Sequence, residues 1–196
     1  MFAPPIHPPT LARWLEMSRT PEIDAAIRAV HTSIAERVAE ARPVCTASAR
    51  CCDFARTGHD LFVTGLEAAW TLDRIPADRA IGGDGVRDAR ARGDCPFLAR
   101  AGGLSACGVH PARPAGCRVY FCDPTRTGFV EQLAEYAARE IRAVHDRFGV
   151  PYVYAEWRHL LGAFLDAGEA VAPTRPLPAP PDPVSGVMLV LISHGA

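Results

Sequence analysis

The chain has 196 residues, of which 48% are hydrophobic and 22% are charged. This length and composition are typical of one folded domain with a substantial core. The formal net charge is −1, which argues against a surface for nucleic acid or for an anionic membrane. All 21 basic residues are arginine, a bias that we attribute to a GC-rich genome and not to a functional surface.

Targeting signals are not recognisable at the ends of the chain. The N-terminus lacks a basic segment followed by a sustained apolar run, so it does not read as a secretory signal. The most apolar run, residues 187–192, is far too short to cross a bilayer. We therefore expect a cytoplasmic protein with no membrane partner. Clustered cysteines in that reducing compartment indicate metal or redox chemistry and not disulfides.

In chain order, the first predicted elements are an arm and a helix. Residues 1–19 carry four prolines and little periodic pattern, and we expect an N-terminal arm packed on the domain through Trp14 and Leu15. Thr20 precedes a proline and a glutamate, the pattern of a helix start. Apolar residues then recur at helical spacing, so a helix is predicted over residues 21–41.

The middle of the chain contains shorter elements. Residues 60–63 can form a short strand. Thr64 and Glu67 fit a capping box, which predicts a short helix through residues 70–75. The glycine-rich and charge-rich segment 82–93 reads as a loop with one helical turn.

Two more helices are predicted near the end. Residues 129–148 present one apolar face. Residues 156–167 form a second predicted helix, which buries its own set of apolar residues and ends before Gly168, the expected C-cap. A proline-rich linker over 173–183 precedes an apolar strand or strap.

The expected fold class is therefore mainly α, an α-rich α+β domain with few short strands around an irregular cysteine-rich centre. We divide the chain into the arm at 1–19, one metal-binding domain at 20–168, and a linker with its apolar strap at 169–196.

All seven cysteines fall in two clusters, and this is the most specific feature of the chain. They are Cys45, Cys51, Cys52, Cys95, Cys107, Cys117 and Cys122. Thiolates at such spacings are typical ligands of zinc or of an iron–sulfur cluster. We expect a local trio in the upstream cluster and a local pair formed by Cys117 and Cys122. Cys95 and Cys107 are the long-range members.

Cys51 and Cys52 are adjacent in the sequence. Neighbouring side chains point in different directions, so we expect that the two do not easily serve one mononuclear site. They either bridge two sites, or one of them faces a second centre or the core.

The downstream cluster resembles a known family. Residues 95–98 read CPFL and residues 107–118 read CGVHPARPAGCR. This resembles the signature of the YkgJ-type cysteine-cluster proteins, a family described as zinc- or iron-chelating domains and often labelled iron–sulfur oxidoreductases. Cys122 matches the family's trailing cysteine, and residues 45–52 resemble its C-x-x-C-x-x-C-C opening. The resemblance covers about residues 45–122 and implies that all seven cysteines bind metal.

One position departs from the family pattern. Ser48 stands where the resemblance implies a cysteine, and a hydroxyl is a much poorer ligand than a thiolate for soft metals. Seven cysteines make one four-sulfur site and one three-sulfur site. The incomplete site either recruits His110, Asp53, Asp123, Ser48 or solvent, or is lost.

Arg113 and Arg118 flank the cysteines of the downstream cluster. We expect them to offset the negative charge of a thiolate centre from outside the ligand shell, the alternative being ion pairs with Asp94 or Asp123. His110 is expected to pack or hydrogen-bond and not to ligate. The apolar residues at 96–98 and 120–121 are expected to plug the core beside the centre.

No phosphate-binding loop, dinucleotide fingerprint or nucleophile elbow is present in the sequence. A nucleophilic pair of a cysteine with His59 or His159 would use up a cysteine that has metal-ligand spacing. Whether the chain is an enzyme stays open. Three classes compete: a redox or protein-modifying iron–sulfur protein, a structural zinc module that contacts a protein partner, and a metal carrier or maturation factor.

Overall fold

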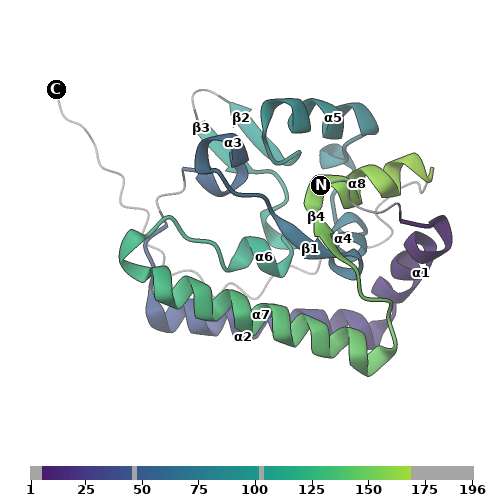
Figure 1. Ribbon diagram of the computed structural model, residues 1–196, viewed down its shortest axis with the longest axis horizontal. Coiled ribbons are helices and arrows are strands. Elements are labelled where there is room, and N and C mark those ends of the chain that lie inside the picture. The colour runs from purple at the N-terminus through teal and green to yellow at the C-terminus, as the bar shows by residue number, and fades with distance from the viewer. Residues whose placement is uncertain (1–5, 46–47, 102–103, 169–196) are drawn as a thin grey trace.

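The computed structural model describes residues 6–45, 48–101 and 104–168 (Figure 1). Helices account for most of these residues, and the strands are few and short, which confirms the mainly α fold class. The proline-rich linker and the apolar strap predicted after residue 169 lie outside the described residues. Within the described ranges, no helix has the length and apolarity needed to cross a membrane.

Two long helices lie side by side along one edge of the molecule (Figure 1). They are α2 (Pro21–Ala41) and α7 (Thr127–Phe148), and their buried residues recur every three or four positions. The sequence predicted both helices. Gly149 ends α7 in the left-handed conformation, with φ of +61°, where a glycine avoids the Cβ penalty.

The N-terminal arm is a helix. Residues Pro8–Ser18 form α1, which packs on α4 (Gly65–Leu72). The expected burial of Trp14 and Leu15 is confirmed, whereas the helical conformation of the arm was not predicted. A proline in the first turn of a helix costs no hydrogen bond, so the prolines there do not prevent α1.

The segment predicted as a loop also forms a helix. Residues Gly83–Arg92 form α5, which packs on α8 (Trp157–Asp166) through Val86 and Ala89. The loop prediction is therefore wrong. Helix α8 matches its prediction, except that Ala167 and not Gly168 is the C-cap.

Two short antiparallel strand pairs complete the framework. Strand β1 (Phe62–Thr64) pairs with β4 (Tyr154–Glu156), and β2 (Leu98–Ala101) pairs with β3 (Leu104–Cys107). The capping box predicted after β1 is present: Thr64 and Glu67 satisfy each other's backbone amides at the start of α4. The remaining short helices are α3 (Phe54–Thr57) and α6 (Ala115–Arg118).

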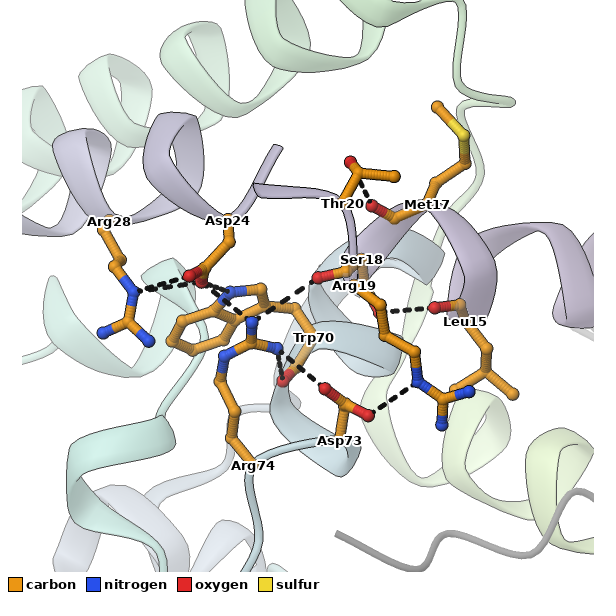
Figure 2. A network of polar contacts seen from close by, with 10 residues as sticks. All are labelled: Leu15, Met17, Ser18, Arg19, Thr20, Asp24, Arg28, Trp70, Asp73 and Arg74. Carbon is orange, nitrogen blue, oxygen red and sulfur yellow. Dashed lines mark hydrogen bonds and ion pairs between the residues drawn. The ribbon is translucent and has the colours of Figure 1, made fainter. Parts of the chain in front are cut away.

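A buried network of charges ties α2 to α4 (Figure 2). The carboxylate of Asp24 accepts hydrogen bonds from the Trp70 indole at 2.9 Å and from the Arg74 guanidinium at 2.8 Å. Asp73 contacts Arg74 at 3.4 Å and pairs with Arg19, in the turn before α2, at 2.8 Å. The network therefore fixes the entry of α2 against the end of α4.

Candidate functional site

Backbone pairing brings the two cysteine clusters together. Cys51 and Cys52 lie in the 3-10 helix η1 (Arg50–Cys52), directly before an isolated bridge that pairs Asp53 with Asp94. The amide of Cys95 donates a hydrogen bond of 2.7 Å to the carbonyl of Cys52. This contact sets the first residue of the downstream cluster against the last cysteine of the upstream one.

The β2–β3 hairpin adds Cys107. Its register places Cys107 opposite Leu98, at the open end of the hairpin and near Cys95. The hairpin base is closed by the amide of Gly108, which donates to the carbonyl of Phe97 at 2.8 Å. Helix α6 then carries Cys117. The start of this helix is fixed by the Ala115 amide, which donates to the buried Glu67 carboxylate at 3.0 Å.

Four thiols meet around Cys52. The thiol of Cys52 shares hydrogen bonds with three others, those of Cys51, Cys95 and Cys107. Cys51 and Cys52 therefore face one another, and the expectation that they point to different places is wrong. The tight turn of η1 permits this, because adjacent side chains of a 3-10 turn are not held on opposite faces as they are in a strand.

The other three cysteines have different positions. Cys117 lines the same cavity as the four contacting thiols. Cys122 does not line it and instead hydrogen-bonds to Ser48, while Cys45 is exposed. The thiol of Cys122 lies within electrostatic range of Cys45 and Cys51, and Cys117 lies within range of Cys95, Cys107 and Cys51. The pair of Cys117 with Cys122 and the trio that includes Cys45 stay predictions. A hydrogen bond of 3.0 Å from the Val44 amide to Asp123 holds these two outer segments to each other.

The thiols differ strongly in acidity. Hydrogen bonding to Cys52 and the nearby Arg113 guanidinium lower the pKa of Cys51 to about 6. Hydrogen bonding to Cys52, together with a backbone amide and Arg113, lowers the pKa of Cys107 to about 7. The pKa of Cys52 is raised because its proton is shared with the neighbouring thiols, and burial raises the pKa of Cys117. Cys51 and Cys107 therefore ionise more readily than an ordinary thiol, whereas Cys52 and Cys117 hold their protons.

The arginines beside the cysteines make no ion pair with a carboxylate in the part of the chain that the structure describes. Arg113 donates to the carbonyls of His110 and Cys117. Arg118 donates to the carbonyls of Arg113 and Pro111 at 2.9 and 2.7 Å. The alternative partners are engaged elsewhere, since Asp94 pairs with Arg92 and Arg100 and Asp123 bonds Thr125.

The other candidate ligands also have structural roles or lie elsewhere. Asp53 caps α3 by accepting from the Arg56 amide, and His110 lies at the surface outside the cavity. His59 does line the cavity, where its ring stacks on Tyr120 with centroids 4.4 Å apart. Glu67 also lines the cavity, although the sequence predicted only its role in the capping box.

The thiols form one wall of a cavity of about 250 Å³. Phe97, one of the residues expected to plug the core beside the centre, is buried and lines this cavity. Further aromatic rings and one side of α7 form the other walls. These contributors are Phe62, Tyr120, Tyr152, Tyr154, Trp157, Val130, Ala134, Ala137, Ala138 and Ile141. The thiols therefore face a mostly apolar enclosure.

Among the described residues, no set of three or more His, Cys, Asp or Glu side chains is arranged so that it could hold a metal ion. The thiols contact one another through shared protons. Comparison with known proteins adds no relative, because no family model, no curated protein and no solved structure matches the chain.

Proposed function

We propose that the chain binds a soft metal centre, either a zinc ion or an iron–sulfur cluster, through Cys51, Cys52, Cys95 and Cys107. The observation that carries this proposal is the convergence of four thiols from three separate segments on Cys52. Thiolate sulfur is the donor that zinc and iron–sulfur clusters share. A reducing compartment such as the cytoplasm would keep these sulfurs available.

The chemistry of the donor set fits such a centre. Metal ligation requires thiolates, and the lowered pKa values of Cys51 and Cys107 favour them near neutral pH. Arg113 contributes positive charge without occupying a carboxylate. A metal would take the place of the protons that the thiols now share, so binding has to release protons and draw the sulfurs around the metal.

The proposed centre has a structural purpose. The segments that carry these cysteines have little regular structure apart from the 3-10 helix η1 and the short β2–β3 hairpin. A metal bound to four of their side chains would cross-link the segments, as structural zinc does in small domains. The motif resemblance to the YkgJ-type proteins supports the same proposal and extends it to membership of that family.

The test is anaerobic purification followed by metal analysis and a visible spectrum. Colourless protein with about one zinc per chain selects the zinc ion, and brown protein with iron and acid-labile sulfide selects the cluster. Cys52→Ser is expected to lose the metal, whereas Cys45→Ser, a change at an exposed thiol, is the matched control and keeps it. Metal-free wild type, or a Cys52→Ser variant with full metal content, contradicts the proposal.

Proton release gives a second readout. Titration of metal-free protein with zinc in weak buffer is expected to acidify the solution, because the shared thiol protons must leave. The signal should be lost in Cys52→Ser and retained in Cys45→Ser. Zinc binding without proton release would show that the thiols are not the ligands.

A further inference from the structure

We propose that the cavity beside the four thiols binds a small, neutral, aromatic molecule. The inference extends the proposed function, since the molecule would lie against the wall that carries the metal ligands. The cavity volume of about 250 Å³ exceeds the roughly 150 Å³ that suffices for benzene. The space therefore admits one ring with a few substituents and not an extended ligand.

Aromatic rings form the entrance of the cavity. Phe62 on β1 and Tyr154 on β4 lie diagonally across the strand pair and pack with centroids 5.8 Å apart. Both stay exposed, at 44% and 54%. Exposed large rings at a cavity mouth are characteristic of a binding site, because the core gains nothing from leaving them in water.

Helix α7 contributes several small side chains to the wall of the cavity. Ala134 and Ala137 line the cavity from α7, with only a methyl group each. Deeper in, Trp157 and Phe97 pack together with centroids 6.0 Å apart. A flat ring between small aliphatic side chains and aromatic faces buries both of its sides, which an aliphatic or branched ligand of equal size does less well.

The charged groups of the wall already have hydrogen-bond or ion-pair partners within the protein. Asp60 pairs with Arg158 at 2.6 Å. Both oxygens of the Glu67 carboxylate accept hydrogen bonds, from Thr64 on one side and from an α6 amide on the other. Arg113 donates to carbonyls and faces the acidic thiols. A charged ligand would also lose its hydration in a mostly apolar cavity, whereas a neutral ligand would not lose the hydration of a charge.

Two tyrosine hydroxyls on the wall of the cavity are available to hydrogen-bond with a ligand. Among the described residues, the hydroxyls of Tyr152 and Tyr154 have no hydrogen-bond partner, although their rings contact His145 and Phe62. A hydroxyl group can both donate and accept. The ligand is therefore expected to carry one neutral polar substituent, such as a hydroxyl or carbonyl.

Three fluorinated probes of similar size test the charge preference. These are para-fluorophenol, para-fluorobenzoate and para-fluorobenzylammonium, each titrated with the full chain and followed by fluorine NMR. We expect the phenol to bind at least roughly tenfold more tightly than either ion, because only the ions lose the hydration of a charge on entering the cavity. Tightest binding of the ammonium or the carboxylate overturns the inference, and so does the absence of phenol binding.

Two variants test whether the phenol probe binds inside the cavity. Ala134→Phe fills the space and is expected to weaken phenol binding at least roughly tenfold, while Ala143→Phe, at an exposed position of the same helix outside the cavity, leaves it unchanged. Tyr154→Ala removes an exposed ring and should weaken binding roughly threefold to tenfold without affecting folding. Unchanged binding in both cavity variants contradicts the proposed location.

Metal content is measured on the same samples. The cavity variants are expected to keep the metal of the wild type, since neither change removes a thiol. Loss of phenol binding with full metal content is the expected outcome. If wild-type protein carries metal but binds no phenol, the proposed ligand site is wrong and the proposed metal centre stands. If metal-free protein binds the phenol, the proposed metal centre is wrong and the proposed ligand site stands.

Discussion

Removal of the Asp24 carboxylate is expected to destabilise the fold strongly. Asp24 lies at the centre of the buried network, where it accepts from Trp70, Arg74 and Arg28. Asp24→Ala leaves the Arg74 guanidinium, whose side chain is 2% exposed, with Asp73 at 3.4 Å as its one remaining carboxylate. It also leaves the indole N–H of Trp70 buried without an acceptor.

The size of the effect follows from these lost partners. Breaking a buried ion pair by deleting one member costs about 3–5 kcal/mol, because the other charge stays out of water. A buried donor that loses its acceptor costs about 1–3 kcal/mol more in isolation. Asp73 still offsets part of the Arg74 charge, and Arg28 is exposed enough to rehydrate. We therefore expect the free energy of unfolding to fall by about 3–5 kcal/mol in total.

Urea unfolding followed by circular dichroism measures this change. The control is Glu16→Ala, which removes an ion pair to Arg13 that is exposed on both sides and should cost less than about 1 kcal/mol. The double variant Asp24→Ala with Arg74→Met should recover part of the loss, since it removes the unpaired charge. A loss below about 1 kcal/mol for Asp24→Ala would refute the assignment of the network as a stabilising element.

Three further predictions concern stability. Burial raises the pKa of Asp24, but hydrogen bonds and nearby guanidinium groups outweigh it and hold the folded-state pKa below the ordinary 3.8. Its contribution is thus present above about pH 4 and lost as the pH falls through the folded-state pKa, so urea midpoints at pH 7 and pH 3 should differ less in Asp24→Ala than in wild type. Gly65→Ala places a methyl group 2.3 Å from the Trp14 ring and should cost about 1–3 kcal/mol in thermal unfolding, whereas Gly162→Ala, with no atom within 4 Å, should gain up to about 1 kcal/mol. Thr64→Ala removes the capping box and should cost about 1–2 kcal/mol by the same assay.

The long helices could be predicted from the sequence because their pattern is redundant. Helices α2 and α7 each span about six turns, so several apolar residues repeat the helical period and one irregular position changes little. Helix α5 has only Val86 and Ala89 as buried contacts, among glycines and charges. Its helical conformation depends on packing against α8, and that contact is not visible in the sequence of α5.

The sequence shows which residue types gather at the candidate site, but it does not show how they are arranged. The spacing of the cysteines indicated ligand chemistry, but proximity in the sequence was a poor guide to which thiols meet. Cys52 contacts Cys95 through a bridge between two irregular segments that are more than 40 residues apart in the sequence. Pairings of this kind depend on tertiary contacts, which local spacing does not encode. The aromatic cavity carried no recognisable motif, because its walls come from many separate segments, among them β1, β4, α4, α6, α7 and α8.

The origin of the four thiols in separate segments also bears on biosynthesis. Cys51 and Cys52 leave the ribosome well before Cys95, and the strand that positions Cys107 needs the rest of the hairpin. During synthesis the early pair is therefore exposed without its partners, and no complete ligand set exists until the downstream cluster has emerged. If the four thiols bind a metal as proposed, loading of that metal has to follow translation of most of the domain. A nascent chain arrested before residue 95 would offer only two neighbouring sulfurs, too few to retain a metal ion against cellular thiols.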